Sequence, residues 1–198
     1  MFNLVIAGVG GQGGLTLSRI VADAAVYAGY SVRTGETLGM AQRGGSVLSF
    51  VRIGNTVRSP LFAFRKADAL IGLEALEAVR ASAYVKTGGL ILVDPVMEDT
   101  LTTLTKRDVY PPLQELMKGL AATGGLVRQI PASAESSRLG NPKAANVLML
   151  GAFCAYADIL PVSEVEESIL RVLGARGAPG VSMFRRGVEI ARAGRVRL

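Results

Sequence analysis

The stretch that decides the fold of this 198-residue chain is FNLVIAGVGGQGG, residues 2–14. It opens with the apolar run 2–7, which contains one Asn and is typical of a strand buried in a parallel sheet. Gly8, Gly10 and Gly13 follow with the spacing G-x-G-x-x-G, and a helix-like pattern of apolar residues comes directly after them. A strand, a glycine turn and a helix in this order predict the first unit of a Rossmann-like α/β fold.

Strand-like and helix-like stretches alternate along the rest of the chain. Strands are expected at 31–34, 46–53, 68–73, 90–93 and 126–130. Helices are expected at 15–28, 74–86, 112–122, 143–157, 163–174 and 180–193. Gly54-Asn55 is a turn signal that leads into Thr56 and Val57, so a hairpin is expected there. The pattern predicts one domain over residues 1–198, with a mostly parallel sheet, helices on both faces and an inserted hairpin.

The composition excludes much of the usual catalytic inventory. Hydrophobic residues make up 49% of the chain and charged residues 19%, which is typical of a folded domain. Histidine is absent, so a catalytic His, a Ser-His-Asp triad and His metal ligands are excluded. The single cysteine, Cys154, can neither form an internal disulfide nor hold an iron–sulfur cluster by itself. It lies in an apolar stretch and is expected to be a buried small hydrophobe.

The chain is basic, with a net charge of +6 and a sequence pI of about 9.8. Arginines concentrate near the C-terminus, where they predict a solvated helix face and a basic tail. Such charge also attracts phosphorylated ligands, acidic proteins or nucleic acid. No zinc-finger spacing or RNA-binding aromatic pattern accompanies it, so a nucleic-acid partner is not expected.

No segment of the sequence predicts a membrane or secreted protein. The longest apolar stretch, 147–160, is shorter than the roughly 20 residues of a membrane span and predicts a buried helix. The N-terminus leads directly into a strand pattern, without the basic and small-residue signals of a secretory leader. We therefore expect a cytoplasmic protein.

The first glycine loop is a candidate binding site, because its backbone can approach a ligand and the following helix N-terminus favours an anion. Its candidate residues are Gly8, Gly10, Gly11, Gln12 and Gly13. Three interpretations stay open: a turn that packs helix on sheet, a contact with phosphate or CoA, and a bound dinucleotide. The dinucleotide lacks its usual acidic partner, because the second expected strand offers Arg33, and the nearest acid, Glu36, follows the end of that strand.

A second flexible loop, GMAQRGGS at residues 39–46, surrounds a single arginine. Its glycines permit close backbone approach, and Arg43 offers a planar fork for a carboxylate or phosphate. The residues alone leave an anion site, a partner contact and a plain turn open.

Two asparagines, Asn141 and Asn146, lie on either side of an expected helix start. Asn141 is expected to cap that helix, with contact to a partner or ligand as the alternative. No pair of carboxylates in the sequence stands out as an acid–base couple.

The two glycine loops and several later motifs resemble the gamma subunit, or gamma domain, of 2-oxoacid:acceptor (ferredoxin) oxidoreductases. GVGGQG at 8–13 and TLGMAQRGG at 37–45 carry most of this resemblance. The second motif is most similar to the small beta subunit of indolepyruvate ferredoxin oxidoreductase. Further matches are SPL at 59–61, ADALIGLE at 67–74, Gly140-Asn141, Asn146 and LGA at 150–152. The resemblance covers most of the chain and is loosest after Val162.

The resemblance implies an accessory subunit of an enzyme that oxidatively decarboxylates a 2-oxoacid, such as indolepyruvate or pyruvate, to an acyl-CoA and passes electrons to ferredoxin. Thiamine diphosphate, magnesium and iron–sulfur clusters would then lie on a large catalytic partner subunit, with CoA as co-substrate. This chain has no cysteine cluster and no G-D-G motif followed by paired Asn. We expect it to bind none of these cofactors alone, to be inactive when isolated, and to be able to form a homodimer through its exposed partner face.

The resemblance also implies roles for the second loop. Both loops would lie at the carboxyl ends of the first strands and face the large subunit near the acyl and CoA site. Arg43 would pair with a carboxylate or phosphate there, while Thr37 and Gln42 add hydrogen bonds beside Gly44 and Gly45. The alternative function is a stand-alone NAD(P)- or nucleotide-binding Rossmann protein, which the missing acid at the second strand argues against.

Overall fold

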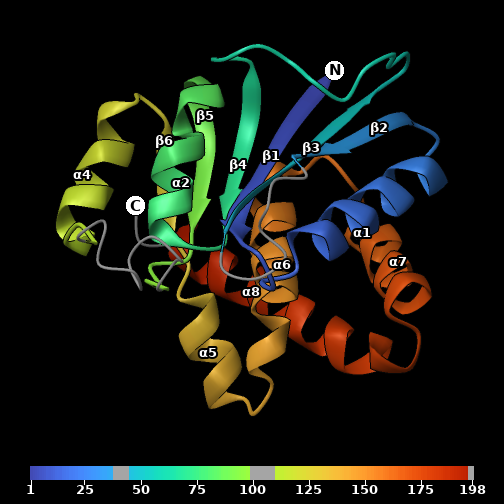
Figure 1. The fold of residues 1–198 in the computed structure, drawn as a ribbon. Helices are drawn as coiled ribbons and strands as arrows, with labels where there is room; N and C mark the ends of the chain where they lie inside the picture. The colour runs from blue at the N-terminus through green and yellow to red at the C-terminus, as the bar shows by residue number, and fades with distance from the viewer. Residues whose placement is uncertain (38–44, 99–109, 196–198) are drawn as a thin grey trace.

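The computed structural model describes residues 1–37, 45–98 and 110–195. These residues form a six-stranded sheet in the order β2-β3-β1-β4-β5-β6, with helices on both faces (Figure 1). β1, β4, β5 and β6 are parallel neighbours, whereas β3 runs antiparallel to both β1 and β2. The strands are β1 (Phe2–Val9), β2 (Ser31–Glu36), β3 (Ser46–Gly54), β4 (Ala67–Gly72), β5 (Val85–Val93) and β6 (Leu126–Gln129). The mostly parallel α/β sheet predicted from the sequence is confirmed.

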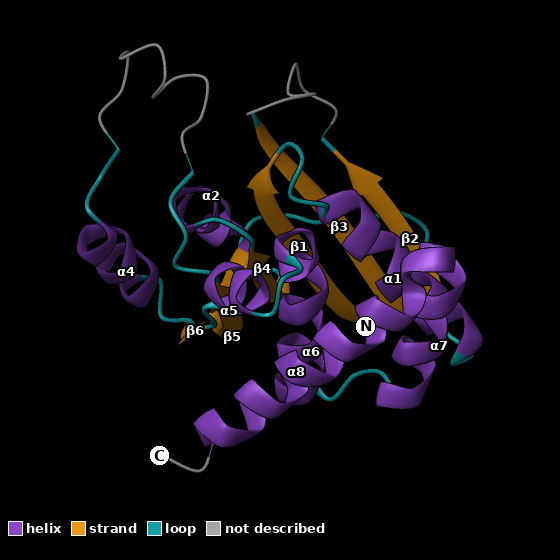
Figure 2. Cartoon of the chain, turned by 90° about the horizontal axis from the view of Figure 1, so that it is seen from below, coloured by secondary structure: helices purple, strands orange, loops and turns teal. Residues whose placement is uncertain are grey.

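The helices lie in two groups on opposite sides of the sheet (Figure 2). One group is α1 (Gly14–Tyr27), α6 (Ala145–Ala157), α7 (Val162–Leu173) and α8 (Gly177–Arg195). The other group is α2 (Ala75–Ala81) and α4 (Leu113–Ala122), and the short α5 (Ala132–Arg138) lies at one end of the sheet. Single 3-10 turns cover Ser82–Tyr84, Pro142–Ala144 and Gly174–Arg176. No helix in the described part of the chain is both long and apolar enough to span a membrane.

Alternation along the central strand separates two hydrophobic cores. Leu4 and Ile6 of β1 face α1 and α6, whereas Val5 and Ala7 face α2 and α4. All four side chains are buried, so β1 is apolar on both faces, as expected for the interior of a covered sheet. This arrangement places the glycine loop, which follows β1, between the helices of the two groups.

Helix α6 is the buried apolar helix that the sequence predicted. It crosses α8 so closely that a Cβ on Gly151 would lie 1.9 Å from the carbonyl oxygen of Phe184. A Cβ on Gly187 would lie 1.9 Å from the carbonyl oxygen of Leu148, so only glycine fits at these two positions. Cys154 is buried in α6, and this burial raises the pKa of its thiol to about 12. Its expected role as a small hydrophobe is confirmed.

The inserted hairpin exists, but its position in the sequence was predicted wrongly. Residues 46–54 pair with the preceding strand, Ser31–Glu36, rather than with Thr56 and Val57. The reason is that β3 already bonds β1 along one edge and β2 along the other, so no edge is left for a third strand. Gly54 and Asn55 end β3 instead of turning it back on itself.

The helix expected over 74–86 is also shorter than predicted. It ends at Ala81, and after one 3-10 turn the chain enters β5 at Val85. Val85 pairs with Ala67 of β4 and is buried, so pairing within the sheet overrides the local helix pattern.

Candidate ligand site at the glycine loop

The first glycine loop has a backbone that requires glycine. Gly11 and Gly13 adopt φ angles of 108° and 82°, in the left-handed region that disfavours side chains. A Cβ on Gly8 would lie 2.7 Å from Oε1 of Gln12 and 3.1 Å from Cβ of Leu73. The G-x-G-x-x-G pattern therefore reflects both backbone conformation and close packing here.

Gln12 fastens this loop from within. Its Oε1 accepts a hydrogen bond from the Val9 N–H at 2.8 Å, and its Nε2 donates to the Leu73 carbonyl at 3.2 Å. The side chain thus joins the end of β1 to the segment that follows β4. Its amide has protein partners on both sides, so a ligand would meet the loop mainly through backbone groups.

Asn146, at the start of α6, closes the loop from the other side. Its Nδ2 donates to the Gly13 carbonyl at 3.2 Å, and its Oδ1 accepts from the Val147 N–H at 2.9 Å. A Cβ on Gly13 would lie 2.3 Å from that Nδ2, so the contact needs glycine.

Asn141 makes no side-chain cap to the 3-10 turn that it precedes, so the capping interpretation is wrong. Both asparagines instead line one cavity.

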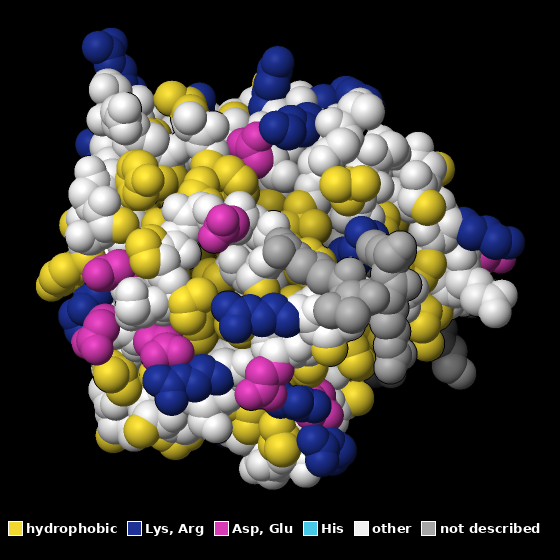
Figure 3. All heavy atoms as spheres, turned by 180° about the vertical axis from the view of Figure 1, so that it is seen from behind, with side chains coloured by type: hydrophobic (Ala, Val, Ile, Leu, Met, Phe, Trp, Pro, Cys, Tyr) yellow, Lys and Arg dark blue, Asp and Glu magenta, His cyan; other side chains and the backbone are white. Residues whose placement is uncertain are grey.

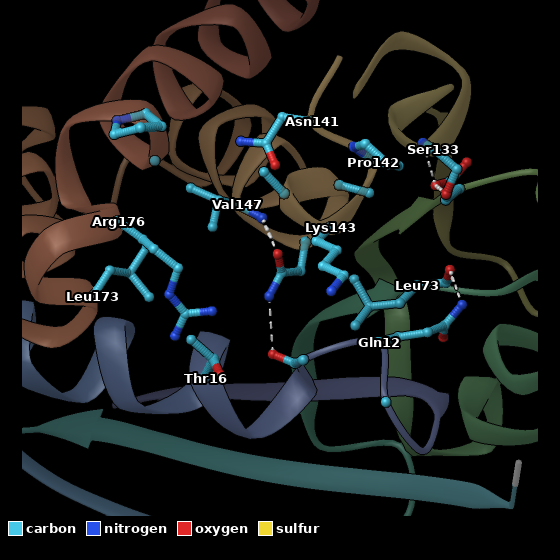
Figure 4. Close-up of a pocket in the computed structure, with 18 of the residues that line it drawn as sticks. Gln12, Thr16, Leu73, Ser133, Asn141, Pro142, Lys143, Val147, Leu173 and Arg176 are labelled. Atoms are coloured by element: carbon cyan, nitrogen blue, oxygen red, sulfur yellow. Dashed lines mark hydrogen bonds between the residues drawn. The ribbon is translucent and has the colours of Figure 1, made fainter. Parts of the chain in front are cut away.

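That cavity, of about 910 Å³, lies between the glycine loop, the N-terminus of α6 and the α7–α8 connection (Figure 4). Six of the predicted site residues line it: Gly10, Gly11, Gln12, Gly13, Asn141 and Asn146. Further lining residues are Thr16, Lys143 and Arg176, together with the acids Asp94 and Glu98. Gly8, Thr37 and Gly45 are not among the lining residues.

The cavity carries positive charge at the end where the glycine loop meets α1. Helix α1 has Gly13 as its N-cap, with no side chain bonded to its first N–H groups, so these donors face outward. Lys143 and Arg176 are exposed, and in the described part of the chain neither forms an ion pair. Figure 4 shows both side chains directed toward the α1 side of the cavity. Donors and cations of this kind favour an anionic ligand group.

The carboxylate of Asp94, a buried acid that also lines the cavity, has a structural role. Oδ2 of Asp94 accepts hydrogen bonds from the N–H of Ser133 at 2.8 Å and from its hydroxyl at 2.6 Å. Burial raises the pKa of this carboxyl, while the bonds to Ser133 oppose that rise. Asp94 therefore caps the first turn of α5 from a distance. No group of three or more Asp, Glu or Cys in the described ranges could hold a metal ion.

The second glycine loop meets the first at its stem. The Gly10 N–H donates to the Gly45 carbonyl at 2.9 Å. On the other side of the stem, the Thr37 N–H bonds the Leu48 carbonyl, and the Leu48 N–H bonds the Thr37 hydroxyl. The two loops are therefore neighbours, as predicted. Gln42, Arg43 and Gly44 lie outside the described residues.

A buried carboxylate fixes the β3 side of this stem. Glu77 of α2 is fully buried, and its Oε2 accepts from the Ser46 hydroxyl at 2.5 Å. Its Oε1 accepts from Arg80 at 2.6 Å, so the charge is paired. Ser46 begins β3 immediately after Gly45, and the stem is held on α2 by this contact.

The sheet order argues against a Rossmann-type dinucleotide site. In that fold the strand beside β1 is parallel and ends in an acid for the ribose hydroxyls. Here the neighbour is antiparallel β3, and Glu36 lies one strand further out. Glu36 is the last residue of β2 rather than a residue beyond it, and its carboxylate lies 3.5 Å from the Ser18 hydroxyl. Arg33 is exposed and bonds its own neighbour, the Val32 carbonyl.

Sequence reasoning missed Thr16, Lys143 and Arg176. These residues have no motif in common, and they meet only because the 3-10 turns before α6 and α8 bring two distant segments over the glycine loop. Lys143 is the first residue of the helix expected over 143–157, and no local pattern marked it as a ligand contact.

Several known proteins are similar to this chain in sequence and in fold. Residues 3–195 match the family described as pyruvate ferredoxin/flavodoxin oxidoreductase. The chain is 38% identical to indolepyruvate oxidoreductase subunit IorB of Archaeoglobus fulgidus, covering 88% of this chain and 87% of that one. It is 34% identical to the subunit of the same name from Thermococcus kodakarensis, over 96% of both chains. The gamma subunit of keto/oxoacid ferredoxin oxidoreductase from Geobacter sulfurreducens superposes with a TM-score of 0.72 at 25% identity, covering 98% and 99% of the two chains. The chain therefore belongs to the pyruvate ferredoxin/flavodoxin oxidoreductase family.

Proposed function

We propose that this chain is the small, non-catalytic subunit of a 2-oxoacid:ferredoxin oxidoreductase of the indolepyruvate type. The relatives at 38% and 34% identity bear the name of an indolepyruvate oxidoreductase subunit. The observation that carries the proposal is the cavity, which offers backbone N–H groups and two cations to an anionic ligand. The Asp94 carboxylate accepts a hydrogen bond from the Ser133 hydroxyl, and the Cys154 thiol is buried and protonated. Such a site holds a ligand and leaves the chemistry to another chain.

The chemistry would come from a large partner subunit. It would carry thiamine diphosphate with magnesium, which stabilises the carbanion after decarboxylation, and iron–sulfur clusters that pass electrons to ferredoxin. CoA would accept the acyl group. We propose that a phosphate-bearing part of CoA enters the cavity, because Lys143, Arg176 and the α1 N-terminus provide donors there. The cavity volume of about 910 Å³ falls in the range of cofactor-sized sites.

The second glycine loop would extend this site toward the partner. Its stem is bonded to the first loop through Gly10 and Gly45, and Arg43 precedes Gly45 by two residues in the sequence. We propose that Arg43 pairs with a carboxylate or phosphate at the subunit boundary, with Thr37 and Gln42 adding hydrogen bonds.

Reconstitution tests the subunit assignment. The purified chain and the large subunit of the same organism should each show little 2-oxoacid-dependent reduction of ferredoxin alone, and full CoA-dependent activity with indolepyruvate when combined. The assignment is wrong if the isolated chain oxidises a 2-oxoacid with a nicotinamide cofactor, or if the large subunit is fully active without it.

Variants of the reconstituted enzyme test the ligand site. The double substitution Lys143→Ala with Arg176→Ala should raise the KM for CoA about tenfold or more, because each lost charge-assisted bond weakens binding. Arg192→Ala, an exposed arginine of α8 that does not line the cavity, is the matched control and should leave KM unchanged.

Arg43→Ala should lower either activity or subunit affinity, and an unchanged value for both contradicts its proposed role.

A further inference from the structure

Residues 55–66, which we call the strap, connect β3 to β4 without forming a helix or strand. The strap follows the end of β3 that pairs with the start of β1, so it lies at the opposite end of the sheet from the glycine loop. On this face α2 and α4 pack on β1, β4, β5 and β6 (Figure 2), and the strap takes the place of a helix over β3 and β2.

The inner side of the strap is firmly attached to the sheet. The guanidinium of Arg52 donates to the carbonyls of Ser59 and Leu61 at 3.3 and 3.2 Å. Pro60 packs on Gly35 of β2 so closely that a Cβ there would lie 2.8 Å from the proline ring. The strap is therefore a fixed surface rather than a loose connection.

Aromatic rings hold the second half of the strap. Phe62 packs edge-on against Phe50 of β3, with ring centroids 5.4 Å apart. Phe64 lies against Tyr84 with centroids 4.6 Å apart. The N–H of the next residue, Arg65, bonds the Ala83 carbonyl at 3.0 Å. These contacts fix the direction in which the outer side chains point.

The outer side of the strap presents large apolar side chains to solvent. Leu61 is 60% exposed and Phe64 is 63% exposed, although both stand on attached backbone. Exposed apolar groups that are held in one conformation mark interaction surfaces, because they have already lost the entropy that binding would cost.

The same surface is strongly basic. Between Glu36 and Asp68 the sequence contains no acid, whereas the strap itself contributes Arg58, Arg65 and Lys66. All three are exposed, and none forms an ion pair within the described part of the chain. Figure 3 shows Lys and Arg side chains standing along the upper edge of the molecule, the edge that is also uppermost in Figure 1.

Arg33 extends this charge along the sheet. It pairs across the hairpin with Arg52 and therefore points to the same face, where it is exposed. From Arg33 the β2–β3 hairpin runs to the stem of the second glycine loop at Thr37. The strap therefore packs on the same hairpin that leads to the stem of the second glycine loop.

We infer that the outer face of the strap docks on an acidic surface of the large catalytic subunit, with Phe64 and Leu61 entering apolar recesses and Arg58, Arg65 and Lys66 meeting carboxylates around them. Aromatic anchors flanked by arginine are typical of the energetic centre of such interfaces. A second copy of this chain fits less well, because it would place two basic surfaces against each other. This inference rests on the proposed function, since it assigns the surface through which that subunit is bound.

Binding to the purified large subunit tests the inference. Phe64→Glu should weaken the Kd about 30-fold or more, since it places a charge in an apolar and acidic recess. Leu61→Glu should weaken it about tenfold and does not disturb an aromatic contact, so it covers the case in which Phe64→Glu affects folding. Val26→Glu is the matched control: Val26 is 55% exposed on α1, on the other side of the sheet, and its substitution should change the Kd less than about threefold.

The charge of the partner is tested separately. If the recess is acidic, Phe64→Lys should retain more affinity than Phe64→Glu, and affinity of the unmodified chain should fall as salt is raised, because ions screen the attraction. Equal loss in both variants, or a larger loss with Lys, overturns the acidic assignment.

Other outcomes separate this inference from the proposed function. If the unmodified chain binds the large subunit and both glutamate variants bind equally well, the strap inference is wrong and the subunit assignment stands. If the unmodified chain does not bind that subunit at all, the proposed function itself fails. A homodimer, or tight binding of a single-stranded oligonucleotide, that Phe64→Glu abolishes while subunit affinity stays unchanged also overturns the inference.

Discussion

The two ends of the sheet are built for different tasks. At the carboxyl end of β1 the chain is hollowed, and glycines bring backbone N–H groups to a cavity lined by Lys143 and Arg176. At the other end the strap packs on the sheet and exposes Leu61 and Phe64. Both surfaces are basic, but one is a cavity and the other presents exposed apolar side chains. The contrast teaches that positive charge alone does not identify the partner, whereas shape separates a small anionic ligand from a protein surface.

The two ends are also held in place by different interactions. The glycine loop depends on side-chain amides, Gln12 and Asn146, that bond its backbone. The strap depends on a guanidinium, that of Arg52, and on edge-on contacts between aromatic rings. Substitutions that remove one kind of support should therefore affect one end and spare the other.

The largest effect is expected at the glycine loop. Gly13→Ala should lower the free energy of unfolding by about 3 kcal/mol, because it combines left-handed backbone with overlap on the Asn146 amide. Gly11→Ala is the matched control, since its φ is also positive but no atom lies within 4 Å of the added Cβ, and it should cost only about 1 to 2 kcal/mol. Urea unfolding measures both. Equal losses would mean that Asn146 does not restrict this position.

An intermediate effect is expected at the strap. Arg52→Met should cost about 1.5 kcal/mol of unfolding free energy, because it removes charge-assisted bonds to Ser59, Leu61 and Asn3 while keeping apolar length. Affinity for the large subunit should fall as well, while the KM for CoA should not change. A rise in that KM, with stable folding, would show that the two ends are not independent.

The smallest effect is expected from pH. Hydrogen bonds from Arg138 and Arg186 lower the pKa of Glu135 to about 2, and through Arg186 this carboxylate ties α5 to α8 beside the cavity. A lowered pKa means that the stabilisation is complete above the unfolded value near 4.5 and is lost as pH falls toward 2. The contacts that hold the strap, from Arg52 and the aromatic rings, involve no acidic side chain. When the pH is lowered from 7 to 3, amide hydrogen exchange should therefore increase more in α5 than in residues 55–66. Glu135→Gln should remove this pH dependence, and persistence of it in that variant contradicts the assignment.

The sequence was sufficient for the parallel framework but not for the order of its strands. The apolar run 2–7 and the glycine spacing predicted β1, the loop and α1, because these signals are local. The insertion of β3 between β1 and β2 was missed, since a hairpin can join either edge of a sheet and local patterns do not say which. The turn at Gly54-Asn55 therefore predicted the wrong partner strand.

The candidate site was predictable to a similar extent. The glycine spacing predicted the first loop, and both loops were expected at the carboxyl ends of the first strands. The hydrogen bond from the Gly10 N–H to the Gly45 carbonyl shows that the two loops are neighbours. Lys143 and Arg176 were not, because cations that converge from distant segments leave no pattern in the chain. The inward bonds of Gln12 were also missed, since the same amide would serve a ligand equally well.

The glycine-to-carbonyl contacts between α6 and α8 have a mechanical consequence. Asn146 lies in the first turn of α6 and Arg176 immediately precedes α8, and these two helices pack backbone against backbone at Gly151 and Gly187. Packing this tight leaves no room for the two helices to slide past each other, so α6 and α8 should move together as one rigid unit. The side of the cavity that these helices form should then keep its shape when a ligand binds.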